Sequence, residues 1–287
     1  MRSVVWSLMT VAAVALAGCS NSSDSSSTKS SDATAASAPA AQGTNITGTV
    51  SIRGDIKPSA QDSLDIKLVD VTAQGSAPLA TKTIAPATTF PQQFELDFSA
   101  ANVVPNDMYV VEATLTDGDR HYTMPLQAPV LTQGHPNSNI AIELMPEQTP
   151  GEKMLAAFQN AQKQIGGLKR SSGTKLEPNA SRAWQVFRDG LEVKFIRELV
   201  DYGDKGFTST DYAYKDGKPW VVQQKKMPNQ NAKPTSVDTA GWADDGTLVL
   251  KTHDAGGISG ALSDSDAGNL QQQAKDILNL ATGGKGK

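Results

Sequence analysis

Alternation of apolar and polar residues runs through the chain from about Asn45 to Met145. Five stretches show it, with apolar side chains at every second or fourth position: Ile46, Val50 and Ile52; Leu64, Ile66 and Leu68; Phe94, Leu96 and Phe98; Tyr109, Val111, Ala113 and Leu115; Ile140, Ile142 and Leu144. Successive side chains of a strand point to opposite faces, so this period of two is typical of half-buried β-strands. The pattern predicts strands that each turn one face toward a core.

Turn-forming residues separate these stretches and set the predicted fold. Asp117-Gly118 lies between two alternating runs, as expected for a hairpin turn. Other breakers occur at Lys57-Pro58, Pro86, Pro91 and Pro105-Asn106. About seven short strands divided in this way, with no helical period among them, predict an antiparallel all-β sandwich over residues 45–146.

Two later stretches follow a helical period instead. Thr149-Pro150-Gly151-Glu152 has the form of a capping box with proline at the first helical position. One helix face then carries Met154, Phe158, Ala161 and Ile165. Ser263 precedes a second amphipathic stretch whose apolar stripe is Leu270, Ala274, Ile277, Leu278 and Ala281. The sequence therefore predicts helices over about 150–165 and 264–281.

The stretch between these helices is rich in turns. Asp-Gly pairs at 189–190, 216–217 and 245–246 separate apolar segments, which predicts a meander of five or six strands from Trp184 to about Thr252. Residues 171–181 are predicted to be a short linker. A helical period also fits residues 193–200, but the flanking hairpin signals favour a strand.

The simplest arrangement packs both helices on one face of the meander, which predicts an α+β domain over residues 149–287. In the alternative, the last helix docks on a partner protein. One segment, DYAYKDGKPWVV, resembles a single hairpin repeat of MORN-like proteins.

The N-terminus carries the pattern of a lipoprotein signal. Arg2 precedes an apolar run that is too short to span a membrane, and Leu16-Ala17-Gly18-Cys19 follows it as a lipobox. We expect cleavage between Gly18 and Cys19, removal of residues 1–18 and acylation of Cys19. Ser20 at the next position is typical of outer-membrane lipoproteins that face the periplasm. An ordinary secretory signal and a short membrane anchor are the alternatives.

Composition narrows the function classes. Residues 20–44 contain nine serines and no large apolar residue. They cannot bury enough surface to offset their ordering entropy, so residues 19–44 are predicted to be a disordered tether.

The formal net charge of −4 argues against a nucleic-acid partner. Cys19 is the only cysteine, so no disulfide within the chain and no thiolate metal site is expected.

Motifs for catalysis are missing from the sequence. The three histidines are far apart, none has metal-ligand spacing, and no phosphate-binding or nucleophile motif occurs. We therefore predict no catalytic residue, no metal and no cofactor. The acidic residues that could supply an acid/base pair are predicted to be a solvated face: Glu192, Glu198, Asp201, Asp204 and Asp211.

Aromatic residues concentrate in the second predicted domain. Tyr212 and Tyr214 share a strand face, and Trp220 follows the next turn. Cross-strand packing explains them most simply. The alternative is that these three residues form an aromatic platform that binds a glycan or a peptide.

Several short motifs within residues 45–145 occur in an order that resembles the YbaY family of envelope lipoproteins. They are Gly48-x-Val50, Leu68-x-Asp70-Val71, Pro91-x-x-Phe94-x-Leu96-x-Phe98, the run from Tyr109 to Gly118, and Pro129-Val130-Leu131-Thr132. That family is similar to the YscW-type pilotin lipoproteins of type III secretion. The resemblance implies a β-sandwich lipoprotein of the envelope. Pilotins escort a secretin to the outer membrane, and they lack the second domain.

Together these features predict an outer-membrane-anchored periplasmic lipoprotein that acts as a non-enzymatic binding or assembly module. Its partner would be an outer-membrane or secretion protein, held at a strand edge of the sandwich. The alternative is a glycan- or cell-wall-interacting protein that acts through its aromatic-rich second domain as a binding protein, an inhibitor or a hydrolase.

Overall fold

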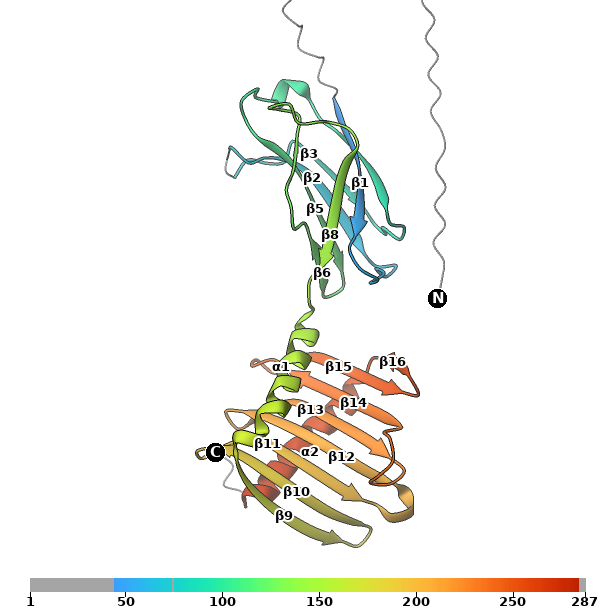
Figure 1. Cartoon of the computed structure of the whole chain (residues 1–287), viewed down its shortest axis with the longest axis vertical. Coiled ribbons are helices and arrows are strands. Elements are labelled where there is room, and N and C mark those ends of the chain that lie inside the picture. The colour runs from blue at the N-terminus through green and yellow to red at the C-terminus, as the bar shows by residue number, and fades with distance from the viewer. Residues whose placement is uncertain (1–43, 74, 284–287) are drawn as a thin grey trace, which may run out of the picture. The chain divides into compact units, whose positions relative to one another are not determined.

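The computed structural model describes residues 44–73 and 75–283 (Figure 1). These residues form two eight-stranded β-sheets and two α-helices, so the fold is mostly β. Cys19, the predicted signal segment and nearly all of the predicted tether lie outside the described residues. Within the described ranges, no helix is long and apolar enough to cross a membrane.

The first sheet contains strands β1 to β8. Their bounds are β1 Asn45–Ile52, β2 Ser63–Asp70, β3 Ala80–Ile84, β4 Gln92–Asp97, β5 Tyr109–Asp117, β6 Arg120–Thr123, β7 Ala128–Val130 and β8 Ile140–Pro146, with a 3-10 turn at Ala100–Asn102. The strands follow the path β3-β2-β5-β6-β8-β1-β4, and β7 pairs with β5. β1 and β8 run parallel, whereas the other pairings in this sheet are antiparallel.

The first sheet is nearly barrel-like. A short ladder between β6 and β8 joins its two halves into one path. The end strands β3 and β4 approach each other, with Lys82 Nζ 3.3 Å from the Glu95 carbonyl oxygen, but no ladder joins them. The predicted short strands and the Asp117-Gly118 hairpin are confirmed. The arrangement is one curled sheet rather than the two separate sheets of the predicted sandwich.

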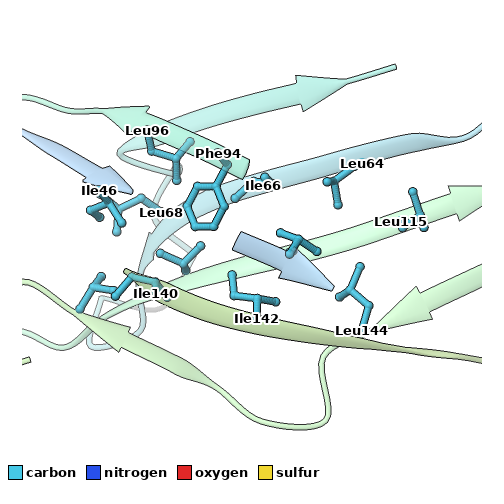
Figure 2. Close-up of a cluster of buried hydrophobic side chains, with 14 of the residues drawn as sticks. Ile46, Leu64, Ile66, Leu68, Phe94, Leu96, Leu115, Ile140, Ile142 and Leu144 are labelled. Carbon is cyan, nitrogen blue, oxygen red and sulfur yellow. The ribbon is translucent and has the colours of Figure 1, made fainter. Parts of the chain in front are cut away.

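Alternation along the strands builds the core of this sheet. Figure 2 shows the inward-facing side chains gathered in one interior, among them Ile46, Leu64, Ile66, Leu68, Phe94, Leu96, Leu115, Ile140, Ile142 and Leu144. Each such burial contributes about 1.5–3 kcal/mol. Gly48 is required for this packing, because a Cβ there would lie 2.3 Å from the Ile140 carbonyl oxygen and 2.7 Å from the Phe94 ring.

The second sheet is an antiparallel meander in strict chain order. Its strands are β9 Lys169–Glu177, β10 Ala180–Asp189, β11 Glu192–Asp201, β12 Phe207–Lys215, β13 Lys218–Met227, β14 Ser236–Trp242, β15 Leu248–Ala255 and β16 Ile258–Gly260. Helix α1 spans Pro150–Gln164 and α2 spans Asp264–Thr282, with 3-10 turns at Ile165–Gly167 and Gly203–Lys205. The prediction of a strand over residues 193–200 is confirmed by β11.

Both predicted helices form, and their caps are the predicted ones. The Glu152 backbone N–H donates to Thr149 Oγ1 at 3.2 Å, and the Thr149 N–H donates to Glu152 Oε2 at 2.9 Å, which completes the capping box. Ser263 Oγ accepts from the Asp266 N–H at 3.0 Å at the start of α2. The apolar stripe of α2 is buried against its own sheet through Leu270, Ala274, Ile277 and Leu278. The simpler interpretation of this helix is confirmed.

The prediction that both helices pack on one face of the meander is wrong. Phe158 of α1 packs with Phe195 and Val221, whereas α2 packs over Ile196 and Val222. Neighbouring strand residues point to opposite faces, so the two helices cover opposite faces, as Figure 1 shows. β11 and β13 have apolar residues at successive positions. Both faces of the sheet are therefore apolar, and each is buried by one helix.

Two further predictions about this meander are wrong. Residues 171–181, predicted to be a linker, are instead most of β9 and the start of β10. These two strands pair antiparallel, from Lys169 opposite Arg188 to Glu177 opposite Ala180. The sheet has eight strands rather than five or six, because β9 and the short β16 carry almost no alternating apolar residues. β9 and β16 are strands because each is hydrogen-bonded to a neighbouring strand. Neither of them has an apolar face.

Candidate functional site

The hydrogen bonding of the first sheet is interrupted beside β5. One side of β5 pairs with β2 along its length, so β6 and β7 must share the other side. There β7 pairs with Tyr109–Val111 and β6 pairs with Leu115–Asp117. Neither strand reaches residues 112–114, and the Ala113 N–H donates instead to Met124 Sδ at 3.0 Å. No strand therefore pairs with residues 112–114 on this side of β5.

A shallow cavity of about 260 Å³ lies over this open backbone segment. Met124, Pro125 and Leu126 line it from the connection between β6 and β7. Leu126 is 79% exposed, the most exposed large apolar side chain of the first sheet. We call this cavity, together with residues 112–114, the β5 opening. It offers both a backbone edge and an apolar contact, which are the two requirements for holding an extended peptide.

The gap between β3 and β4 is a second open edge. Each of these strands is hydrogen-bonded on one side only. A groove of about 440 Å³ lies beside the gap and is lined mainly by polar side chains, including Thr47, Thr49, Lys82 and Gln93. This edge can also accept a strand, but it lacks the apolar contact that Leu126 supplies at the β5 opening.

The predicted aromatic platform does not form. Tyr212 and Tyr214 do share a face, but both are buried under α2. The Tyr212 hydroxyl donates to Glu198 Oε2 at 2.6 Å, and the Tyr214 hydroxyl donates to the Ala274 carbonyl at 2.7 Å. Burial first, and then the nearby Glu198 carboxylate, raises the pKa of both phenols far above the usual value.

Trp220 lies on the other face of the sheet, in an edge-to-face contact with Phe158 at 6.2 Å between ring centroids. The tyrosines and Trp220 therefore share no exposed surface. The prediction of one platform formed by these three residues is wrong.

Two of the five acidic residues predicted to be solvated are buried instead. Glu198 is ion-paired with Arg182, and Asp211 binds Arg197 through two bonds of 2.7 and 3.0 Å. Gln162 of α1 also donates to Asp211 at 2.9 Å. Each carboxylate is held by fixed partners, which suits a structural role. Among the described residues, no three His, Cys, Asp or Glu side chains are grouped so as to hold a metal ion.

Comparison with protein families finds a match over the first sheet. Residues 41–143 match the family described as type III secretion system lipoprotein chaperone (YscW). A solved structure, an alternative pilotin from the type II secretion system of Vibrio cholerae, is 17% identical over 36% of this chain and 96% of that chain, with a TM-score of 0.33. No curated protein matches the chain.

The chain is thus a mostly β protein in which residues 41–143 are similar to YscW-type lipoprotein chaperones. The match ends before α1, so it leaves the second sheet without a counterpart. It bears out the YscW part of the predicted resemblance, whereas the YbaY part stays a prediction.

The β5 opening was not predicted from the sequence. The interruption in hydrogen bonding depends on which strands pair with β5. Pairing between distant segments cannot be inferred from the alternation of apolar and polar residues within one segment. The run Met124-Pro125-Leu126 was the one available signal of this site. A proline interrupts strand pairing, and the apolar residues on either side of it can still form an apolar surface.

Proposed function

We propose that this protein is a lipid-anchored, non-enzymatic chaperone of the bacterial envelope that binds a secretin or another secretion component. The match of residues 41–143 to a lipoprotein chaperone family carries the proposal. The client binds as an extended segment at the β5 opening, where it displaces Met124 Sδ from the Ala113 N–H, pairs with β5 between β6 and β7, and places an apolar side chain against Leu126.

Anchoring is part of the proposed mechanism. Acylated Cys19 holds the chain in the outer membrane, since several acyl chains bind a bilayer firmly whereas one binds marginally. Residues 20–44, predicted from their serine-rich composition to be a tether, separate this anchor from the folded part. The folded part can then capture a client in the periplasm and keep it close to the membrane into which it must assemble.

Crosslinking in intact cells tests the role. The tagged full chain is crosslinked and its partners are identified by mass spectrometry, with Cys19→Ser as the variant that loses the anchor. The proposal predicts one dominant partner from a secretion system, with reduced recovery in Cys19→Ser. A diffuse set of partners that is the same for both proteins contradicts it.

A substitution at the β5 opening tests the site. Leu126→Asp places a charge on an exposed side chain, so folding is preserved while the contact with an apolar client is lost. Leu176→Asp is the matched control, because Leu176 is 87% exposed on β9 of the second sheet. We expect the client crosslink to fall at least about tenfold in Leu126→Asp only. Equal recovery from both variants excludes the β5 opening as the client site.

A further inference from the structure

The outer side of β9 is a long strand edge at one margin of the second sheet (Figure 1). β9 spans nine residues and pairs with β10 along one side. Among the described residues, no strand pairs with its other side. Alternate residues of a strand direct their backbone N–H and C=O groups to the same side. β9 therefore has a row of outward backbone groups to which an added strand can bond.

The charge of this edge is positive. β9 has the sequence KRSSGTKLE, with three cationic residues and one acidic residue. The acidic residue, Glu177, is already ion-paired with Lys175 at 3.2 Å. Neither Lys169 nor Arg170 has an ion-pair partner among the described residues, and the residue opposite Lys169 in the ladder is another cation, Arg188. An edge with one dominant sign of charge attracts a segment of the opposite sign.

This charge determines which strand the edge accepts. Like charges directly opposite each other on neighbouring strands are destabilising, whereas opposite charges contribute about 0.2–1 kcal/mol per pair. Pairing of β9 with the β9 strand of a second copy would bring cations close to cations. An incoming strand with Asp or Glu at alternate positions would instead place carboxylates beside Lys169 and Lys175, which lie on one face of β9.

The middle of β9 is covered by an aromatic ring from the neighbouring strand. Gly173 lies opposite Trp184 of β10, and a Cβ at Gly173 would be 2.5 Å from the Trp184 ring. The indole therefore extends over β9 from the β10 side, and only glycine leaves room for it. Trp184 is partly exposed. A strand added to β9 would lie close to this ring, so the edge offers an apolar contact and Trp184 fluorescence can report binding.

We propose that the outer edge of β9 binds an extended, acidic segment of a partner protein. The segment adds to the sheet as a further strand, with backbone hydrogen bonds to β9 and carboxylates beside Lys169, Arg170 and Lys175. Backbone bonds supply affinity, and the charge pattern selects the partner. The site lies outside the family match, so it does not depend on the chaperone role.

Titration of the full chain with synthetic peptides tests the proposal. The acidic probe alternates Glu and Val over nine residues, the length of β9, and the basic probe has Lys in place of each Glu. Tryptophan fluorescence and heat are recorded. We expect the acidic probe to bind with a Kd below about 0.1 mM, and the basic probe not to bind. An increase in salt from about 0.05 M to about 0.5 M should weaken binding at least about fivefold, because it screens the charges.

Charge reversal on β9 tests the location of the site. The double variant Lys169→Glu with Arg170→Glu changes two exposed residues, so folding is preserved. It should weaken binding of the acidic probe about tenfold or more and allow the basic probe to bind. The double variant Lys218→Glu with Lys233→Glu is the matched control. It makes the same change in net charge at exposed positions away from β9, and it should leave the binding of both probes unchanged.

A third peptide separates strand addition from simple attraction of charge. The acidic probe with a methyl group on every backbone nitrogen keeps its carboxylates but has no N–H to donate, so we expect it not to bind. The proposal is overturned if this methylated probe binds as tightly as its parent, or if the acidic probe does not bind up to about 10 mM. It is also overturned if the variant with both β9 charges reversed binds the acidic probe as the parent chain does.

Discussion

Glu198 is a buried carboxylate whose surroundings show how single residues organise the second sheet. Arg182 pairs with one of its oxygens and the Tyr212 hydroxyl donates to the other at 2.6 Å. Arg182 also lies 3.6 Å from Glu177 on the edge strand β9. A buried ion pair adds little net stability, but removal of one partner leaves the other charge without compensation.

Replacement of Glu198 should therefore be costly. We expect Glu198→Ala to lower the free energy of unfolding by about 3 kcal/mol, because the buried Tyr212 hydroxyl loses its acceptor and Arg182 keeps only its longer contact with Glu177. Urea denaturation measures the change. Glu192→Ala is the control, since its pair with Lys194 is partly exposed and should cost less than about 1 kcal/mol. Equal losses of unfolding free energy in the two variants would contradict the larger contribution of the buried network.

Asp238 predicts a dependence of stability on pH. Burial acts to raise the pKa of Asp238, but His253 Nδ1 at 2.5 Å and Lys226 Nζ at 3.0 Å outweigh burial and hold that pKa below its ordinary value. A lowered carboxyl pKa stabilises the fold above the unfolded-state value near 4, and this contribution is lost as the pH falls through the folded-state pKa.

We expect Asp238→Asn to be less stable than the parent by about 2 kcal/mol at pH 7. The difference should shrink as the pH falls below about 4. Urea denaturation at a series of pH values measures it, with Asp244→Asn, from the exposed pair with Lys215, as the control. A difference that is constant down to the lowest pH would rule out this linkage.

At the scale of elements, sequence-based prediction succeeded where apolar residues recur at a regular period. The stripe of α2 and the strands of the first sheet have apolar residues at a regular period, the capping box at Thr149 has its characteristic residue types, and each formed as predicted. Strand β9 has no such face, so the sequence predicted a linker there. Its partner β10 supplies the hydrogen bonds that make it a strand.

Gly48 and Gly241 should respond differently to the same substitution. A Cβ at Gly48 would lie 2.3 Å from the Ile140 backbone oxygen, whereas a Cβ at Gly241 would lie 2.4 Å from the flexible Met154 Sδ. We expect Gly48→Ala to cost about 3 kcal/mol and Gly241→Ala about 1 kcal/mol, because only a side-chain end can move aside. Thermal or urea unfolding of both variants compares them. A larger loss in Gly241→Ala would contradict this assignment.

For the whole molecule, the buried apolar residues fall into three clusters, one within the first sheet and two on the faces of the second. The sequence predicted this division through its change from alternation to mixed periods near residue 149. It could not predict the β5 opening, because that opening depends on which strands pair with β5, and tertiary contacts decide the pairing.

Separate clusters predict separate unfolding transitions. Ile66→Ala should lower the stability of the first sheet by about 2–5 kcal/mol. The described tryptophans, Trp184, Trp220 and Trp242, all belong to the second sheet, so the fluorescence transition should stay in place while circular dichroism shows an earlier loss of strand signal. A matching shift of the fluorescence midpoint would show that the two sheets unfold as one cooperative unit.

The margins of the second sheet have a consequence for solubility. Its outer strand β9 has the sequence KRSSGTKLE and is exposed along most of its length, and at the other margin β16 is only three residues long. Lysine-rich and very short edges are poor templates for the addition of another copy of the chain. The second sheet can thus stay wide and open at both margins and still resist aggregation between copies of the chain.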